Sequence, residues 1–267
     1  MYTLKNNLSI PGIGIHSGKS VDMTISPSKP SKGIRFFLHG DLVSVSIQNI
    51  GVNHFRSTTL TNGKTTIQTP EHFLSACFAL SLTDIDVNLS SNECPILDGS
   101  AIEFVKKLKP NRRKINTLYN SLQITSPIEF KFQDSIYTAR PSSNFLILAT
   151  LSYPKHWLKQ MKFEYEHSEC HYIQQISKAR TYGFTHEIEM LKANGLAKGG
   201  SLDNALVITD SGYLNEPRYK DELVRHKILD FIGDISIGYN RIQGEFNIYK
   251  PSHQANIAFL KYLEEIN

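Results

Sequence analysis

The feature that most restricts the fold of this sequence is an order of elements that occurs twice, about 150 positions apart. In each copy an apolar helix precedes a short strand, and a second helix follows. The copies comprise the helix Glu71–Leu82, the strand Asp84–Leu89 and a helix from Gly99, then the helix Asp221–Ile237, the strand Phe246–Tyr249 and a helix capped by Ser252. This interval exceeds a solenoid repeat. The sequence therefore predicts two similar α+β domains, residues 1–112 and 113–267.

Local signals define the expected elements more closely. Thr69 is predicted to cap the first helix, with Pro70 at the first helical position, where the missing N–H of proline costs nothing. Segments rich in β-branched and apolar residues predict further strands at Val21–Ile25, Leu42–Ile50 and Asn144–Leu151. We expect the helices to form a layer against antiparallel or mixed sheets.

The composition is that of an ordinary globular protein, with 40% hydrophobic and 20% charged residues in a chain of 267. This mix excludes disordered and fibrous proteins. No apolar run approaches 18 residues, and Lys5 interrupts the segment where a signal peptide needs an apolar stretch. These observations predict a soluble, cytoplasmic protein. The distant cysteines Cys77, Cys94 and Cys170 indicate no disulfide framework, so any metal must be held by histidines and carboxylates.

The basic character of the chain comes from one segment. The formal net charge is +4, but six positive charges lie between Lys106 and Lys114, so the rest of the chain carries −2. Charge collected in one run is typical of a solvated linker between domains and does not predict nucleic-acid binding. At most, this run is expected to give weak peripheral contact with anionic membranes.

The second apolar helix carries the strongest candidates for chemistry. His226, Asp230 and Asp234 follow each other at intervals of four and fall within an arc of about 80° at 100° per residue. A neutral imidazole and a carboxylate one turn apart can bind one Zn²⁺, and the next carboxylate can orient a neighbouring group. The same spacing also occurs on salt-bridged helix faces, where Arg225 and Lys227 would be the partners.

The first helix opens with Glu71 and His72, where the helix dipole favours an ionised carboxylate and a neutral imidazole. If the two helices face each other, His72, His226 and Asp230 supply three metal ligands, and Glu71 can deprotonate a water molecule in the fourth position. Acidic residues are also common at helix starts for dipole reasons alone. Glu71 and His72 therefore indicate a metal site only when they are combined with His226 and Asp230 of the second helix.

Two other motifs are weaker. His167, Cys170 and His171 have a spacing that could bind a metal, but Ser168 is predicted to cap a helix there, which places His167 outside the shared face. The glycine-rich segment from Gly12 to Gly18 (GIGIHSG) does not match a dinucleotide-binding fingerprint and follows no predicted strand, so we interpret it as a turn between strands.

Seven motifs in order identify the resemblance. They are GIGIHSG from Gly12, EHFLSA from Glu71, PILDGSA from Pro95, ARTYGF from Ala179, GLAKGGSLDNALV from Gly195, RHKILDFIGD from Arg225 and YKPSH from Tyr249. Over essentially its whole length the chain resembles the UDP-3-O-acyl-N-acetylglucosamine deacetylase family, zinc enzymes of lipid A biosynthesis. The resemblance implies two β-α-α-β domains packed as a sandwich, with the active site between them, and hydrolysis of the N-acetyl amide to release acetate.

The resemblance also implies roles for individual residues. His72, His226 and Asp230 would bind one zinc ion, or Fe²⁺ in its place. Glu71 would be the general base, and the Thr181 hydroxyl would stabilise the tetrahedral oxyanion together with the metal. His253 would protonate the departing amine, with Asp234 holding it charged and correctly turned. The resemblance thus implies catalytic roles for Glu71, His253, Asp234 and Thr181, and metal binding by His72, His226 and Asp230.

Substrate contacts are expected from further residues of the family motifs. Lys227 and Lys250 would contact the UDP-linked amino sugar, although either could be a surface charge. An inserted β-α-β unit near residues 179–207 would hold the acyl chain, and its predicted lining is Tyr182, Phe184, Leu191 and Leu196. The alternative for these four is that they pack the inserted helix on its sheet. No obligate protein partner is predicted.

Two departures from the family pattern affect the expected site. Pro251 and Ser252 precede His253 where the family usually has serine and glycine, so this loop lacks a glycine that permits unusual backbone angles. Tyr182 stands where phenylalanine is common, and its hydroxyl must find a partner if it is buried. A competing hypothesis is a catalytically inactive nucleotide-sugar-binding module of the same fold, which predicts loss of the base or acid; the sequence retains both, as Glu71 and His253.

Overall fold

The computed structural model describes residues 1–52, 56–153 and 157–266. The strands are β1 Tyr2–Leu4, β2 Leu8–Ile13, β3 Ser20–Pro27, β4 Ile34–Leu38, β5 Asp41–Ser44, β6 Thr59–Thr61, β7 Thr66–Gln68, β8 Ile85–Leu89, β9 Arg112–Lys114, β10 Ser121–Gln123, β11 Ile128–Phe132, β12 Ser135–Arg140, β13 Phe145–Tyr153, β14 Lys159–Glu166, β15 Tyr182–Phe184, β16 Leu206–Ile208 and β17 Arg241–Tyr249. The α-helices are α1 Glu71–Ala79, α2 Ile102–Leu108, α3 Glu169–His171, α4 Thr185–Ala193, α5 Glu222–Ile235 and α6 His253–Ile266.

Each half of the chain forms one mixed sheet with the same strand order. The first sheet runs β2-β3-β8-β4-β5, and the second runs β11-β12-β17-β13-β14, with β10 added beside β17. In both sheets the central strand is parallel to one neighbour and antiparallel to the other. In β8, Val87 lies opposite Ile25 and Phe36, and in β17, Ile248 lies opposite Tyr137 and Ala149. This equivalence confirms the predicted α+β fold with a duplicated unit.

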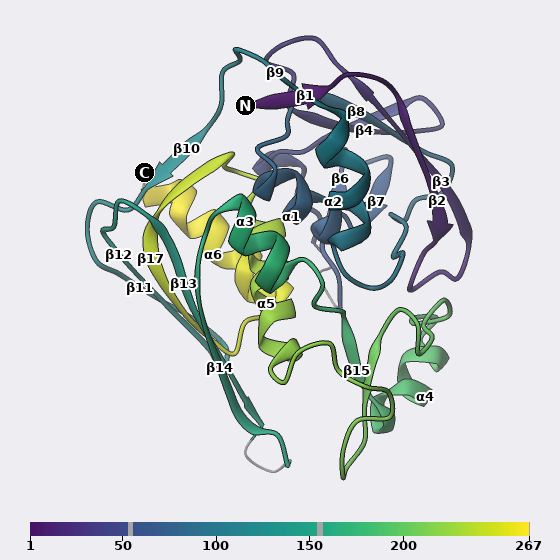
Figure 1. Ribbon diagram of the computed structural model, residues 1–267, viewed down its shortest axis with the longest axis vertical. Helices are drawn as coiled ribbons and strands as arrows, with labels where there is room; N and C mark the ends of the chain where they lie inside the picture. Colours follow the sequence, from purple (N-terminus) through teal and green to yellow (C-terminus); the bar gives the residue numbers. More distant parts are fainter. Residues whose placement is uncertain (53–55, 154–156, 267) are drawn as a thin grey trace.

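The principal helices lie between the two sheets. In each half one helix precedes the central strand (α1, α5) and another follows it (α2, α6), as the sequence pattern predicts. Figure 1 shows these four helices packed between the sheet of the first half and the sheet of the second. The alternating burial of β8 and β17 places one face of each sheet against this layer. Helices α1 and α5 therefore meet at the centre of the molecule.

Gly233 permits the close approach of α5 to α1. A Cβ atom at this position would lie only 2.2 Å from the backbone carbonyl oxygen of Glu71. A backbone atom cannot move aside as a flexible side chain can. We expect Gly233→Ala to lower the free energy of unfolding by about 1–3 kcal/mol, although alanine favours a helix over glycine by about 1 kcal/mol. Denaturant titration measures this change.

The matched control for this variant is Gly212→Ala, because nothing lies within 4 Å of a Cβ atom built at Gly212. Since Glu71 begins α1, Gly233→Ala should also lower catalytic activity, whereas Gly212→Ala should not. Equal stability of the two variants would contradict the close-contact argument.

An inserted unit lies in the chain between β14 and β17 of the second sheet. Strands β15 and β16 are parallel, and α4 connects them, so the segment is a β-α-β unit. Figure 1 shows it projecting below the sheet of the first half. Its backbone packs closely on first-half loops: a Cβ atom at Gly199 would lie 2.3 Å from the carbonyl oxygen of Gly14, and one at Gly99 would lie 1.8 Å from that of Asn204. Gly99 and Gly199 thus allow the inserted unit to pack closely against the loops of the first half.

The GIGIHSG segment contains the end of β2, at Ile13, and the turn from β2 to β3. The predicted turn is confirmed, whereas the expectation that no strand comes before it was wrong. The buried carboxylate of Glu93 accepts hydrogen bonds from the backbone N–H groups of His16 and Ser17, both at 2.8 Å. A Cβ atom at Gly14 would lie 2.1 Å from this carboxylate, so glycine is required there. The turn holds His16 at the edge of the cavity described below.

Three local predictions were wrong. Thr69 does not cap α1: Pro70 immediately precedes the helix, and the Thr69 hydroxyl donates instead to Glu93, at 3.4 Å. The helix ends at Ala79, because Ser81 adopts a positive φ of 51°. The strand expected over Leu42–Ile50 stops at Ser44, since the side chain of Asn49 donates to the Ser44 carbonyl at 2.9 Å and closes a turn.

The basic run is solvated, as predicted, since five of its six cations are exposed, but it is not a linker without structure. Its residues form the end of α2, a 3-10 turn and β9, which pairs with β1 of the first half. Arg112 and Lys109 form ion pairs with Glu169 at 2.8 and 3.1 Å, and Lys106 pairs with Glu103 at 2.7 Å. The ion pairs with Glu169 and the pairing of β9 with β1 therefore hold the run in ordered structure. No helix in the described ranges is long and apolar enough to span a membrane.

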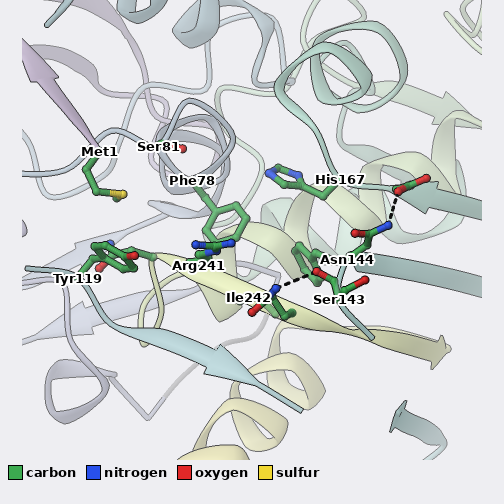
Figure 2. Close-up of a pocket in the computed structure, with 13 residues that line it drawn as sticks. Met1, Phe78, Ser81, Tyr119, Ser143, Asn144, His167, Arg241 and Ile242 are labelled. Atoms are coloured by element: carbon green, nitrogen blue, oxygen red, sulfur yellow. Dashed lines mark hydrogen bonds between the residues drawn. The ribbon is translucent and has the colours of Figure 1, made fainter. Parts of the chain in front are cut away.

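A cavity of about 440 Å³ lies between the halves at the end of α1 remote from Glu71. Figure 2 shows His167 beside Phe78 in its wall. Burial lowers the pKa of His167 to about 4. The unfolded chain binds this proton near pH 6.5, whereas the folded protein binds it only near pH 4, so acid favours unfolding between these values.

From pH 7.5 to 5 we expect His167 to reduce stability by about 1–2 kcal/mol. The change that isolates this effect is His167→Asn, which removes the titrating group but keeps a polar δ atom that can bond the Tyr165 hydroxyl, 2.9 Å from Nδ1 of His167. Unfolding free energies of both proteins at the two pH values provide the measurement. If they fall in parallel, His167 does not contribute.

Candidate metal centre and active site

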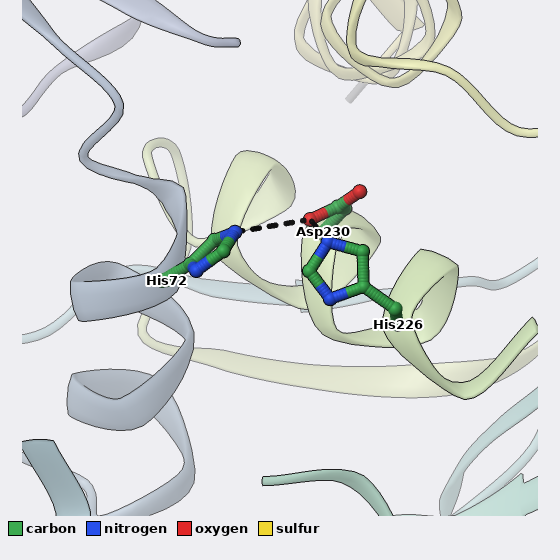
Figure 3. A group of neighbouring side chains, drawn as sticks. All are labelled: His72, His226 and Asp230. Carbon is green, nitrogen blue, oxygen red and sulfur yellow. Dashed lines mark ion pairs between the residues drawn. The ribbon is translucent and has the colours of Figure 1, made fainter. Parts of the chain in front are cut away.

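The predicted metal ligands come from two helices that face each other. His72 is in the first turn of α1, and His226 and Asp230 are one turn apart on α5. The Oδ1 atom of Asp230 lies 3.2 Å from Nε2 of His226 and 3.8 Å from Nε2 of His72. Figure 3 shows His72 approaching the other two side chains from the opposite helix. Among the residues that the structure describes, these three form the group of possible metal ligands whose binding atoms converge, within 4.8 Å of one another.

Burial and hydrogen bonding leave these side chains ready to bind a cation. Nδ1 of His226 donates to the carbonyl of Ala179 at 3.1 Å, so its Nε2 carries the lone pair. Burial lowers the pKa of His226 to about 4 and that of His72 to about 3. Burial alone would raise the pKa of Asp230, but His226 and Lys227 hold it well below its usual range. The Oδ1 atom of Asp230 is buried without a hydrogen bond, and with two neutral imidazoles this fits a divalent cation.

The rival cluster does not converge in this way. Ser168 caps α3 and accepts the backbone N–H of His171, as predicted. Nδ1 of His167 pairs with the Tyr165 hydroxyl, and Nδ1 of His171 lies 3.0 Å from the carbonyl of Glu166. The ring nitrogens therefore have separate partners.

Glu71 lies beside the candidate metal ligands and is itself buried. Its Oε1 is 3.6 Å from Nε2 of His253, and its Oε2 accepts the backbone N–H of Thr58 at 3.3 Å. Burial raises the pKa of Glu71 to about 8, although the nearby His253 lowers it. A divalent cation on the neighbouring His72 would lower this pKa further. The carboxylate is then placed to accept a proton inside the cavity.

His253 faces Glu71 from the second half. Its Nδ1 lies 2.9 Å from Oδ2 of Asp234, which is fully buried on α5. Burial alone would lower the pKa of His253, but Asp234, Asp230 and Glu71 raise it to about 9. The ring therefore carries a proton at neutral pH and can donate it from Nε2. Asp234, the third member of the predicted α5 face, orients this histidine.

The altered residues before His253 do not displace it. Ser252 caps α6, as predicted, and its hydroxyl accepts the backbone N–H of Ala255 at 3.2 Å. The left-handed conformation in this loop occurs at Lys250, whose φ is 51°, rather than at the position usually taken by glycine. The capped helix start thus presents His253 to the site.

A cavity of about 410 Å³ contains the reactive groups. Thr181 and Lys227 line it together with Glu71, His72, His226, Asp230 and His253. The Lys227 ammonium is 2.8 Å from Oδ2 of Asp230 and lies over the Tyr182 ring, 5.4 Å from its centroid. Lys250 is outside this lining: its ammonium lies 3.5 Å from Asp134, next to the segment Pro251–Gln254, which does line the cavity.

A second, mostly apolar cavity of about 300 Å³ adjoins the first beneath the inserted unit. The two share five lining residues: Ile15, His16, Arg56, Thr181 and Tyr182. Of the predicted acyl-binding residues, Leu191 and Tyr182 line the apolar cavity and Phe184 lines the polar one, whereas Leu196 lines neither. Leu196 follows α4, where its backbone N–H donates to the Leu191 carbonyl. The geometry suits a ligand with a polar part and an apolar chain.

The extra hydroxyl of Tyr182 does find a partner. It lies 3.0 Å from the hydroxyl of Tyr153, at the end of β13. We expect Tyr182→Phe to lower the free energy of unfolding by about 1 kcal/mol, because the Tyr153 hydroxyl is left unpaired. Tyr153→Phe should cost a similar amount.

In the double variant Tyr153→Phe/Tyr182→Phe, part of this loss should return, since neither hydroxyl remains to be buried alone. Thermal unfolding of the four proteins measures the coupling. Strict additivity would show that the two hydroxyls do not interact.

Several residues of the site were missed by the sequence analysis. Asn256 lies three positions after His253, so helical spacing could have placed it beside that residue. Thr58 and Arg56 lie in a loop without a recognisable period; Arg56 forms an ion pair with Glu187 of α4 at 2.7 Å and so connects the first half to the inserted unit. Only the tertiary structure brings Arg56 to the cavity and Thr58 to Asp234 and Glu71.

Comparison with known proteins is consistent with this geometry. The model of the family described as UDP-3-O-acyl N-acetylglycosamine deacetylase matches residues 1–265. A curated relative, the UDP-3-O-acyl-N-acetylglucosamine deacetylase of Thermodesulfovibrio yellowstonii (strain ATCC 51303 / DSM 11347 / YP87), is 38% identical over 267 aligned residues. The alignment covers 98% of this chain and 91% of the relative.

Proposed function

Because the chain belongs to the UDP-3-O-acyl N-acetylglycosamine deacetylase family, we propose that it hydrolyses the N-acetyl amide of UDP-3-O-acyl-N-acetylglucosamine in lipid A biosynthesis. The products are acetate and UDP-3-O-acyl-glucosamine. The observation that carries this proposal is the convergence of His72, His226 and Asp230 in one cavity with Glu71 and His253. The set contains a metal site, a proton acceptor and a proton donor.

One Zn²⁺ ion per chain fits the two imidazoles and the carboxylate best, and Fe²⁺ accepts the same ligands. When bound, the ion supplies a Lewis acid and makes water more acidic. His72, His226 and Asp230 would hold the ion, and three protein ligands are the number found in many catalytic zinc sites.

Different residues near the metal ligands accept and donate protons in the proposed reaction. Glu71 takes a proton from the attacking water, and the backbone N–H of Thr58 keeps its carboxylate in place. The Thr181 hydroxyl donates to the oxyanion that develops on the amide oxygen. His253 donates a proton to the departing amine, while Asp234 stabilises the imidazolium and fixes its orientation.

The two adjoining cavities suit the two parts of the proposed substrate. The polar cavity, with Lys227 in its wall and Lys250 near its rim, would hold the sugar and the diphosphate. The apolar cavity, with Leu191 and Tyr182, would hold the acyl chain, and Phe184 and Leu196 would contribute nearby surface. The cytoplasmic location and the absence of an obligate protein partner stay predictions from the sequence.

The decisive test is acetate release from UDP-3-O-acyl-N-acetylglucosamine by the purified protein. It is measured on the protein as isolated, after chelation, and after one equivalent of zinc is restored. Activity that is lost on chelation and returns with zinc supports the substrate, the reaction and the metal together. A folded, zinc-loaded protein that releases no acetate across several acyl lengths would indicate a nucleotide-sugar-binding module instead.

A further inference from the structure

A buried chain of hydrogen bonds extends from His253 away from the cavity. The Oδ2 atom of Asp234 accepts two hydrogen bonds, one from Nδ1 of His253 at 2.9 Å and one from Nδ2 of Asn256 at 2.8 Å. Its other oxygen, Oδ1, receives the Thr58 hydroxyl at 2.5 Å. Both oxygens of the carboxylate are thereby fixed, and Asp234 and Asn256 have no exposed surface. Asn256 has not been given any role in the proposed reaction.

Tyr137 and Asp234 together fix the orientation of the Asn256 amide. The Tyr137 hydroxyl donates to Oδ1 of Asn256, 2.6 Å away, and Nδ2 of Asn256 donates to Asp234. With its oxygen bound to this donor, the amide can only present its NH₂ group to Asp234. If the amide were reversed, two oxygens would face each other in a buried site, which is costly.

The Tyr137 ring is held rigidly in the second-half core. It is fully buried on β12 and makes edge contacts with Phe231 of α5 and Phe259 of α6, at centroid separations of 6.1 and 5.3 Å. These two helices carry Asp234 and His253. The ring and its hydroxyl therefore connect the sheet to both helices at the point where the acid is positioned.

We propose that Tyr137 and Asn256 are positioning residues for His253, which hold the Asp234 carboxylate in the orientation that directs the histidine toward the departing amine. This inference rests on the proposed deacetylation. Neither residue lines the cavity that contains the reacting groups. Their loss should therefore affect the rate of the chemical step and leave substrate binding and metal binding unchanged.

The test uses Asn256→Leu, which removes the amide at similar volume, and Tyr137→Phe, which removes only the hydroxyl. We expect kcat for acetate release to fall at least about tenfold in each, with KM and zinc content within about twofold of wild type. Tyr165→Phe is the matched control, because Tyr165 is equally buried and its hydroxyl bonds His167 outside the site. A fall in kcat no larger than that of the control overturns the proposal.

Coupling to Asp234 separates positioning from a general loss of stability. In an Asp234→Asn background, Asn256→Leu should cause little further loss of kcat, because the group through which it acts is already altered. If its effect persists undiminished, Asn256 does not act through Asp234 and the proposal is wrong. Should Asn256→Leu fail to fold, Tyr137→Phe in the same background decides the question.

A measurement independent of turnover completes the design. The Nδ1 proton of His253, hydrogen-bonded to a carboxylate, should give a downfield proton resonance, assigned by its loss in His253→Gln. We expect Asn256→Leu and Tyr137→Phe to shift or broaden this resonance and Tyr165→Phe to leave it in place. An unchanged resonance in both variants overturns the proposal. If the wild-type protein releases no acetate, the proposed function fails, and this resonance alone decides whether the two residues position His253.

Discussion

Replacement of Glu71 by glutamine is expected to lower kcat for acetate release by about 10²–10⁴-fold while zinc stays bound. Glutamine has nearly the same shape but cannot accept the proton of the attacking water. The carboxylate is placed for this transfer by its position at the start of α1 and by the Thr58 backbone N–H, 3.3 Å from Oε2. Because Glu71 is not one of the converging ligands, metal content should remain near one ion per chain.

The measurement combines steady-state kinetics with metal analysis of the same preparation. Glu103→Gln, an identical change on the surface of α2 remote from the site, is the control and should retain full activity. A Glu71→Gln protein with wild-type kcat would show that another group accepts the proton. A protein that has lost its zinc would instead place Glu71 among the ligands.

Replacement of His226 by alanine is expected to remove both the metal and the activity. The Nε2 atom of His226 lies 3.2 Å from Oδ1 of Asp230, at the centre of the converging group. Two remaining protein ligands cannot hold a catalytic zinc ion of this type firmly. We expect zinc affinity to fall by at least about 100-fold, and kcat at limiting zinc to fall with it.

His171→Ala is the matched control, because His171 belongs to the cluster that does not converge. It should retain zinc and activity. Zinc titration with a competing chelator gives the affinities, and circular dichroism verifies that both variants are folded. Wild-type zinc affinity in His226→Ala would overturn the assignment of this residue as a ligand.

The parts of the fold that depend on periodicity were predictable. The spacing of apolar residues located α5 and α6 to within a few residues, because each helix buries one continuous face. The failures at Thr69 and in the basic run have a common cause. In both, a distant carboxylate, Glu93 or Glu169, binds the group that local rules assigned to a cap or to solvent. Such long-range partners leave no pattern in a single sequence.

In the candidate site, too, the residues that share a helix face were predictable, whereas those brought together by long-range packing were not. His226, Asp230 and Asp234 share one helix face, so their proximity followed from the sequence. The approach of His72 required the assumption that α1 and α5 meet, which the packing of Gly233 on Glu71 now explains. Thr58 reaches Asp234 across 176 positions of sequence, and no local signal marks it.

The candidate metal ligands come from both halves of the chain, so cation binding depends on the association of the two halves. One half of the chain contributes His72, and the other contributes His226 and Asp230, so neither half alone contains the full ligand set. Any free energy gained on binding a cation is therefore gained only when the halves are associated. Thermodynamic linkage then requires that bound zinc increase the free energy of association of the two halves. The increase equals the amount by which association of the halves increases the free energy of zinc binding.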